Sequence, residues 1–351
     1  MTEPGQLVPG VLLTVAIGAV GGTVFFFLGL PLAWMLGAMC ATTVAALGGA
    51  PLQFWLPLRT IMITVIGTLL GSAFTPEVVE RAGHWLGGVG VTVAYVAVIS
   101  AVVLVYLVRT GRFDRITCFF AATPGGLGIM TLVGESHGGD PRAISLTHAT
   151  RILIVVFSIP LYLTFVEGLE IGPTTQLVGK VEVAGPVDLA ILAVCGVVGS
   201  LVAHKLRIPN AGFMGPFALS AAVYFTGFVE GRPPIPLVWI AQLVIGSALG
   251  CRFVGVGLGD VRRIVVVALG SATLMLVSAI LVSRLAAPLL GLDTTALVLA
   301  LAPGGLPEMT LMALALDIDT AFVSTMHIVR IILVVAAAPF LFRLLGWRPS
   351  P

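Results

Sequence analysis

Long apolar stretches recur along the whole chain, with short polar connections between them. About twenty apolar residues are enough for an α-helix to cross the hydrocarbon core of a bilayer. Apolar segments begin near residues 7, 31, 57, 85, 116, 142, 186, 209, 236, 264, 295 and 321. Because backbone polar groups in lipid must be satisfied within the protein, this pattern predicts an all-α polytopic membrane protein.

The composition agrees with this prediction. The 351 residues are 58% hydrophobic and only 10% charged, and the mean hydropathy is +1.12. These proportions lie far from those of soluble domains, and no stretch is left over for one. The first ten residues, "MTEPGQLVPG", contain no Lys or Arg. They lack the basic start of a cleavable signal peptide, so we expect the first helix to be retained.

The chain is an internal duplication. At a constant offset of 179, residues 124–160 match residues 303–339 at 15 of 37 positions without a gap. The motif "PGGLGIMTL" in the first half corresponds to "PGGLPEMTL" in the second, and "VIGTLLG" corresponds to "VIGSALG". We therefore predict three parts, which are a first membrane repeat (1–166), a polar linker between repeats (167–185) and a second membrane repeat (186–351).

The number of crossings in each half decides how the repeats are oriented. If one of the six segments enters and leaves by the same face, five cross and the second half is inverted. With the Pro-Gly-Gly segment re-entrant and the N-terminus inside, Lys and Arg divide 12 to 4 in favour of the cytoplasm, against 9 to 7 for twelve full crossings. The positive-inside rule therefore favours two inverted repeats, each of about five transmembrane helices plus one interrupted or re-entrant segment. An alternative is that the broken segment crosses and another segment does not.

The Pro-Gly-Gly motifs predict an interruption at the same place in both halves. Proline removes a backbone donor and glycine permits non-helical dihedral angles, so backbone groups near Gly125, Gly126, Gly304 and Gly305 should lose their helical partners. Such groups survive in a membrane only where they face protein or a wet cavity. A restarting half-helix presents free N–H groups that favour an anion. The alternative is a simple kink in a packed helix.

Each half also places a basic residue deep in an apolar helix. The stretches "SLTHATRILIVV" and "STMHIVRIILVV" put Ser, His and Arg at three-residue steps, on one side of each helix. If the helices begin at the predicted caps Asp140 and Asp319, then Arg151 and Arg330 lie roughly 16 Å along the axis, near mid-bilayer. An Arg at that depth must face the protein interior, either to bind an anion or to hold carbonyls exposed by the break.

The two histidines that are repeated, His148 and His327, are candidates for proton coupling, because imidazole titrates near neutral pH. A buried, hydrogen-bonded imidazole is the rival interpretation. We predict no metal site, because no His-rich or Cys-rich cluster supports one.

Three further polar residues follow the glycines. Glu308 has Ile129 as its counterpart, so symmetry does not require it, and it could balance an Arg or bind a proton or cation. Thr131 and Thr310 could donate hydroxyl groups to a ligand or bond back to their own helix. Together with the glycines and the two Arg residues, these side chains are the predicted substrate-binding set.

Through both Pro-Gly-Gly-Leu segments and both His-x-x-Arg helices, the chain resembles the AbrB family of duplicated bacterial inner-membrane proteins, which also carry the labels ammonia monooxygenase and AbrB regulator. The resemblance spans almost the whole chain. It implies an architecture similar to cation–proton antiporters and bile-acid-type transporters, with inverted repeats and interrupted helices. It also implies a multi-pass protein of the bacterial inner membrane, and the positive-inside count predicts that both termini lie in the cytoplasm.

We therefore expect secondary transport of a small, anionic solute coupled to H⁺ or Na⁺. The rival is a membrane-embedded sensor that affects gene expression indirectly, because the chain has no spare length for a nucleic-acid-binding module. A monooxygenase would need a cluster of metal ligands that the sequence does not contain. The expected partners are the lipid bilayer, the solute and its coupling ion, with no enzyme activity, no cofactor and no direct nucleic-acid contact, and the chain could form a homo-oligomer.

Overall fold

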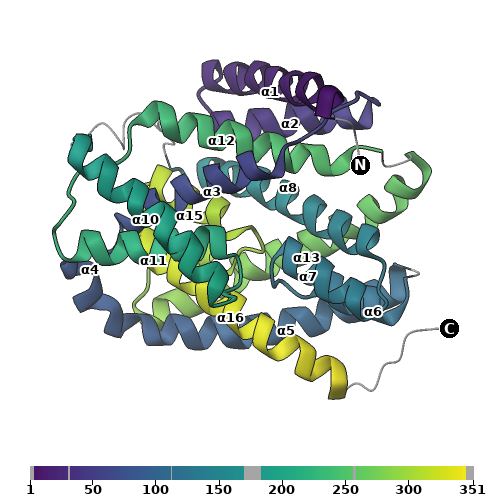
Figure 1. Cartoon of the computed structure of the whole chain (residues 1–351). Coiled ribbons are helices and arrows are strands. Elements are labelled where there is room, and N and C mark those ends of the chain that lie inside the picture. The colour runs from purple at the N-terminus through teal and green to yellow at the C-terminus, as the bar shows by residue number, and fades with distance from the viewer. Residues whose placement is uncertain (1–3, 31, 112, 170–182, 256–257, 345–351) are drawn as a thin grey trace. The chain divides into compact units, whose positions relative to one another are not determined.

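The computed structural model describes residues 4–30, 32–111, 113–169, 183–255 and 258–344 (Figure 1). Within these ranges the chain is helical and forms no strand longer than an isolated bridge between Val183 and Arg232. In chain order the helices are α1 (Pro4–Phe27), α2 (Ala33–Leu47), α3 (Leu56–Gly71), α4 (Pro76–Glu80), η1 (Arg81–Trp85), α5 (Leu86–Thr110), α6 (Arg115–Ala122), α7 (Leu127–Ser136), α8 (Pro141–Phe165), α10 (Pro186–Lys205), α11 (Ala211–Phe225), α12 (Ile235–Gly250), η2 (Cys251–Phe253), α13 (Leu258–Leu290), α14 (Thr294–Leu301), α15 (Leu306–Ala315) and α16 (Thr320–Leu344). Most of the predicted linker, residues 170–182, lies outside the described ranges.

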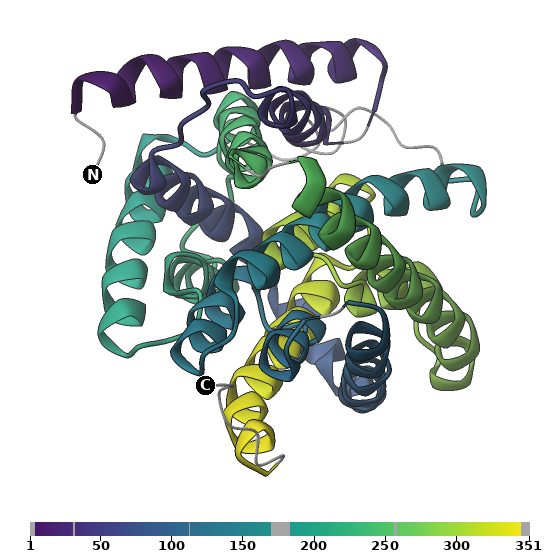
Figure 2. The same ribbon diagram turned by 90° about the vertical axis from the view of Figure 1, so that its right-hand side faces the viewer.

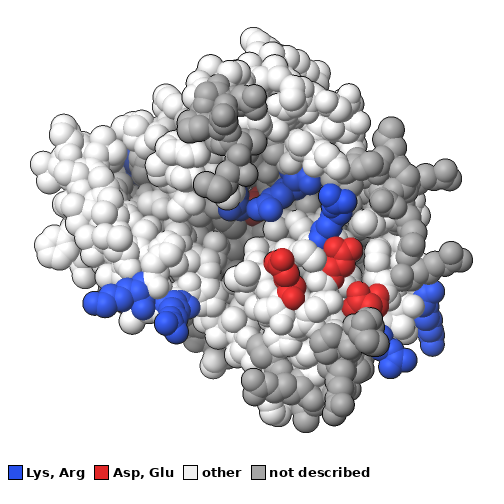
Figure 3. Space-filling view, turned by 45° about the vertical axis from the view of Figure 1, so that its right-hand side comes forward, with Lys and Arg blue, Asp and Glu red and all other residues white. Residues whose placement is uncertain are grey.

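Seven helical stretches in the described part of the chain are long and apolar enough to cross a membrane. They are Val8–Phe27, Ala82–Thr110, Pro141–Phe165, Pro186–Lys205, Ile235–Phe253, Ile264–Leu290 and Thr320–Phe342. Most of the surface in Figure 3 carries neither basic nor acidic side chains. The protein is therefore an all-helical, membrane-type chain, as the apolar pattern predicts.

Helix boundaries repeat between the two halves. At an offset of 179, α6, α7 and α8 correspond residue for residue to α14, α15 and α16, and α3 corresponds to α12. At an offset of 178, α2 corresponds to α11. Helix α13 begins earlier than the apolar pattern predicts. The pattern missed its first turns because they contain Asp260, Arg262 and Arg263.

The helices group into two compact units, and each draws on both halves. The first unit comprises Met1–Arg81, Pro160–Gly255 and Thr310–Ala321. The second comprises Ala82–Ile159, Val256–Met309 and Phe322–Pro351. Three-dimensional packing therefore combines the opening helices of each half in one unit and the later helices of each half in the other.

In the first unit, pairs of glycines bring neighbouring helices into close contact. Figure 2 shows α1, in dark purple, beside α2. A Cβ atom added to Gly21 would collide with the backbone of Gly37, and one added to Gly37 would collide with Gly21. Gly199 of α10 and Gly215 of α11 repeat this relation. Small residues allow membrane helices to approach this closely and gain dispersion contacts along their length.

The halves of this unit also exchange equivalent contacts. Helix α12 packs on α2, and α3 packs on α11. A Cβ on Gly250 would meet Thr42, whereas a Cβ on Gly71, its counterpart, would meet Ser220, the counterpart of Thr42. The two halves therefore pack on each other through corresponding residues within this unit.

In the second unit, α5 packs on α13, and the short helices α6 and α14 pack beside α5 and α13. Asp114 begins α6, where its Oδ1 accepts a hydrogen bond of 2.8 Å from the Thr117 amide. Asp293 begins α14 in the same way, accepting from the Ala296 amide at 2.6 Å. These N-caps fix where each interrupted segment starts.

Candidate functional site

Both Pro-Gly-Gly motifs interrupt a helix in the second unit. In the first half, α6 ends at Ala122 and α7 begins at Leu127, and in the second half α14 ends at Leu301 and α15 begins at Leu306. We call the two connections the first break (residues 123–126) and the second break (residues 302–305). Gly126 has a φ of 95°, a conformation that favours glycine, so the motif does produce non-helical backbone.

The four glycines of the breaks are tightly surrounded, with one exception. A Cβ on Gly125 would meet the Val334 side chain of α16, and one on Gly304 would meet Met309. A Cβ on Gly305 would overlap the carboxylate of Glu308. Gly126 is the exception, since nothing lies within 4 Å of its added Cβ. Glu308 is itself buried, with 4% of its surface exposed.

The two histidines make the same contact in both halves. His148 Nε2 lies 3.0 Å from the carbonyl oxygen of Phe120, and His327 Nε2 lies 3.0 Å from that of Leu299, its counterpart in α14. A carbonyl can only accept, so Nε2 carries the hydrogen in both rings. In the neutral form of either ring, Nδ1 is then the acceptor.

In the second half, the arginine binds the break. Arg330 Nη1 donates to the Ala302 carbonyl at 2.7 Å, and Nη2 donates to the Gly304 carbonyl at 2.8 Å. The guanidinium thus satisfies two of the carbonyls that the interruption exposes. His327 Nδ1 is then left buried and without a hydrogen-bond partner.

In the first half, the arginine turns to its own histidine instead. Arg151 Nη2 lies 2.6 Å from His148 Nδ1 and donates to it, while Nη1 lies 3.9 Å from the sulfur of Met275. The first break satisfies one of its carbonyls through its own backbone, because the Gly125 amide donates to the Thr123 carbonyl at 2.9 Å. Arg151 therefore does not bind the carbonyls of its break, as Arg330 does.

The two arginines and Tyr95 form a charged cluster inside the second unit. Arg151 and Arg330 are each 4% exposed and interact electrostatically with one another and with Tyr95 of α5. Neither guanidinium forms a salt bridge with a carboxylate among the described residues, and the Nε atom of each is buried without a hydrogen-bond partner. Two buried positive charges without a paired carboxylate favour an anion between or beside them.

Sequence reasoning did not single out Tyr95. Its hydroxyl donates to the Met275 carbonyl at 2.7 Å and lies 3.2 Å from Ser278 Oγ, so it joins α5 to α13. The available signal was a tyrosine inside an otherwise apolar segment, in a chain with only four tyrosines. A buried tyrosine hydroxyl generally has such a partner.

The remaining residues that the sequence singled out have different surroundings. Thr131 Oγ1 donates to Leu127 O at 2.7 Å within α7. Thr310, in α15, is fully buried and is counted with the first unit. Asp140 caps α8, because its Oδ1 accepts from the amides of Arg142 at 2.8 Å and Ala143 at 3.2 Å.

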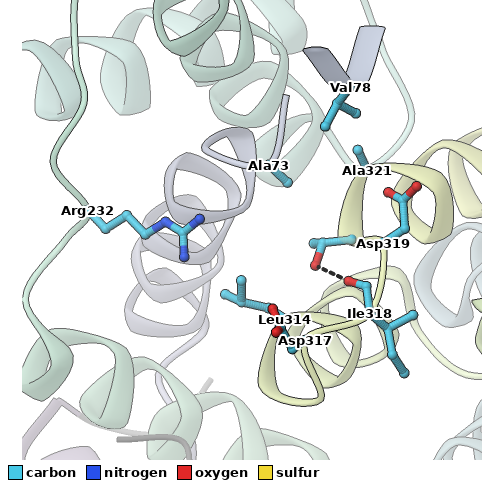
Figure 4. A pocket seen from close by; sticks show the side chains of 9 residues that line it. Ala73, Val78, Arg232, Leu314, Asp317, Ile318, Asp319 and Ala321 are labelled. Carbon is cyan, nitrogen blue, oxygen red and sulfur yellow. Dashed lines mark hydrogen bonds between the residues drawn. The ribbon is translucent and has the colours of Figure 1, made fainter. Parts of the chain in front are cut away.

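A separate pocket of about 320 Å³ lies in the first unit (Figure 4). It is lined by Ala73, Val78, Arg232, Leu314, Asp317, Ile318, Asp319, Thr320 and Ala321. Arg232 comes from one side and the loop before α16 from the other (Figure 4). Partial burial lowers the pKa of the Arg232 guanidinium, which Tyr224 and Asp317 partly offset. Of these residues, sequence reasoning had named only Asp319, as a helix cap.

No group of three or more His, Cys, Asp or Glu side chains that could hold a metal ion occurs in the described part of the chain.

The fold and the paired breaks define a duplicated, all-helical membrane protein. The chain belongs to the AbrB family: the family model described as "Transition state regulatory protein AbrB" matches residues 34–346. It is 27% identical to "Uncharacterized protein YhjN" of Bacillus subtilis (strain 168), over 94% of this chain and 92% of the relative. It is 23% identical to "Putative regulator AbrB" of Escherichia coli (strain K12), over 92% of each chain. These matches confirm the family predicted from the motifs.

Proposed function

We propose that the protein is a secondary transporter of a small anionic solute, coupled to H⁺ or Na⁺, in the bacterial inner membrane. The solute binds in the second unit at the guanidinium groups of Arg151 and Arg330, beside the two breaks. The observation that carries the proposal is the pair of buried arginines, one from each half, with no carboxylate in a salt bridge to either among the described residues.

The energetic argument rests on the environment of these charges. Burying a cation without a compensating partner costs several kcal/mol. Even the lowest scales give a cost of about 3 kcal/mol. Arg330 is compensated by two carbonyls, whereas Arg151 contacts a neutral imidazole and a thioether sulfur. Arg151 therefore has the stronger need for an anion, and its unpartnered Nε–H gives that anion a donor.

The pocket of the first unit supports the inverted arrangement of the repeats. It gathers the connection after α3, the connection after α11 and the turn before α16. If all twelve segments crossed, the connections after the third and eighth segments would emerge on opposite sides of the membrane. With five crossings per half they emerge on one side, so their sharing of one pocket favours inverted repeats with re-entrant breaks.

Flux measurements with purified protein in proteoliposomes test the transport proposal. A thermal-shift screen of carboxylates, phosphates and sulfonates selects the anion, and uptake is then compared for the wild type, Arg151→Gln and Arg330→Gln. We expect both variants to lose at least about tenfold in uptake, since each removes a charge-assisted contact. Arg142→Gln is the matched control, because Arg142 is an exposed residue at the start of α8. Full uptake by both correctly folded variants would contradict the proposal.

The second candidate function is a membrane-embedded sensor. The printed names of the family and of the Escherichia coli relative refer to regulation. In such a sensor the same cluster binds the anion without moving it, and any effect on gene expression is indirect. Cysteine labelling from both sides of the membrane separates the two. A transporter exposes residues near the breaks alternately to each side, whereas a sensor keeps them accessible from one side with and without the anion.

A further inference from the structure

The two His-x-x-Arg pairs are observed in two different arrangements. In the first half the pair is closed, since Arg151 donates to His148 Nδ1 at 2.6 Å. In the second half the pair is open, since Arg330 binds the carbonyls of the break and His327 Nδ1 has no partner. Both histidines hold the same carbonyl contact through Nε2, so the rings themselves are placed alike.

From this difference we propose that Arg330 and His327 form a proton-controlled switch. With His327 neutral, Arg330 can leave the carbonyls of Ala302 and Gly304 and donate to Nδ1, as Arg151 does in the first half. With a proton from water on Nδ1, that position offers no lone pair and repels the guanidinium, so Arg330 stays on the second break. The inference rests on the proposed transport function and names the proton as its coupling ion.

The closed arrangement is within reach of Arg330. His327 and Arg330 are three residues apart on α16, as His148 and Arg151 are on α8, and side chains at that spacing are neighbours on a helix surface. All four side chains are buried, with exposed fractions of 0% for the histidines and 4% for the arginines. In such surroundings an acceptor nitrogen without a donor is costly, which gives Nδ1 a reason to gain either the guanidinium or a proton.

The groups that face the switch come from several helices. Arg330 itself lies on α16, Arg151 on α8 and Tyr95 on α5, and both of these interact electrostatically with Arg330. Glu308, in the first turn of α15, is the carboxylate that follows the second break. Helix α14, which supplies the carbonyl partner of His327, has no titratable side chain in its residues Thr294–Leu301.

The switch links the proton to the anion. When His327 is protonated, the cluster carries one more positive charge and Arg330 remains at the break, and both changes favour an anion beside Arg151. By thermodynamic reciprocity the bound anion then favours the proton. His148, the counterpart of His327 in the first half, cannot bind the proton in the observed arrangement, because its Nδ1 already accepts a hydrogen bond from Arg151.

Side-chain ¹⁵N spectra of histidine-labelled wild-type protein in nanodiscs provide the first test. Signals of His148 and His327 are assigned from His148→Gln and His327→Gln. We expect His327 to change from a neutral Nε2–H ring to an imidazolium as the pH is lowered, while His148 stays neutral. Titration of His148 instead, or of neither ring, would overturn the proposal.

Hydrogen exchange of residues 304–309 provides the second test and needs no solute. After correction for intrinsic rates, exchange in the wild type should be about tenfold slower when His327 is protonated than when it is neutral, because Arg330 is then confined to the break. The pH dependence should vanish in His327→Gln and persist in His148→Gln. Persistence in both variants, or loss in both, refutes the switch. Because neither test measures uptake, a switch that is present without transport would refute only the proposed function.

Discussion

The first and second breaks begin from nearly the same sequence and reach different arrangements. Both breaks follow a short, Asp-capped helix and contain Pro-Gly-Gly-Leu. Each is followed in the chain by a His-x-x-Arg helix that bonds back to the same interrupted segment. Yet Arg330 holds two carbonyls of its break, whereas Arg151 holds a histidine nitrogen. The contrast with the first unit is clear, since there the halves exchange equivalent glycine contacts.

The backbone of each break explains part of this difference. In the first break the Thr123 carbonyl already accepts from the Gly125 amide. In the second break Ala302 and Gly304 obtain their partners from a side chain. A buried carbonyl needs a donor, either a backbone amide or a side chain. A small change in backbone geometry therefore decides whether an arginine guanidinium must bind the break. Duplication therefore supplied two equivalent arginines, and local backbone bonding gave them different partners.

The largest expected effect comes from removing the arginines. Arg330→Met leaves two buried carbonyls without donors, whereas Arg151→Met leaves one imidazole nitrogen. Both variants remove one buried charge, so the difference between their free energies of unfolding measures how much the hydrogen-bond partners of each arginine contribute. We expect Arg330→Met to be the less stable by about 1–3 kcal/mol, measured by denaturation in detergent. Equal stabilities would mean that the carbonyl contacts contribute nothing beyond the histidine contact.

The next effect concerns the glycine that precedes each restarting helix. Gly305→Ala should destabilise the protein, because the new methyl group overlaps the Glu308 carboxylate, and Glu308→Ala should relieve that overlap. A double-mutant cycle on thermal stability should give a favourable coupling of about 1–2 kcal/mol.

The matched cycle in the first half uses Gly126→Ala and Ile129→Ala. Gly126→Ala is strained by its φ of 95° and not by a neighbour, so removing Ile129 should not relieve it. The two changes should therefore add within about 0.5 kcal/mol. A coupling as large as that of the second half would show that the two breaks are packed alike.

A smaller effect is expected at Thr117, whose counterpart is Ala296. The Thr117 hydroxyl donates to Asp114 and accepts from the Asp140 amide at 2.8 Å, which ties the start of α6 to the start of α8. Thr117→Ala should cost about 1 kcal/mol of stability, the value of one such hydrogen bond. Thr110→Ala, at the exposed end of α5, is the control and should leave the melting temperature unchanged.

The smallest effect is expected at Thr131. Its hydroxyl donates to the Leu127 carbonyl of the same helix, which that helix does not require for stability. Thr131→Val should therefore change the free energy of unfolding by less than about 0.5 kcal/mol. A stable variant with reduced uptake would assign Thr131 to the solute site, and unchanged uptake would remove it from that predicted set.

Much of the fold was accessible from the sequence because membranes impose strong patterns. The starts of most helices fall within a few residues of the predicted apolar segments, and α6–α7 and α14–α15 fall where Pro-Gly-Gly predicts an interruption. The early start of α13 was missed because the charged residues of its first turns give no apolar signal. The grouping of helices into two units was also missed, because contacts between distant helices depend on small residues whose partners the pattern does not identify.

The candidate site divides in the same way. Arg151, Arg330 and the two histidines were predicted from their depth in apolar helices, since buried charge is costly wherever it occurs. Tyr95 was missed because a single tyrosine in an apolar segment has no period or motif.

By itself, the sequence determined that this chain is helical, duplicated, interrupted twice and charged in its interior, because each of these properties follows from local patterns of residue type. Only the tertiary structure decided which atom each buried arginine binds. Arg151 and Arg330 lie in the same His-x-x-Arg-Ile motif, but a guanidinium binds whichever acceptors lie within about 3 Å of it. Those acceptors are placed by the backbone of another segment, at a precision that no pattern of residue types contains.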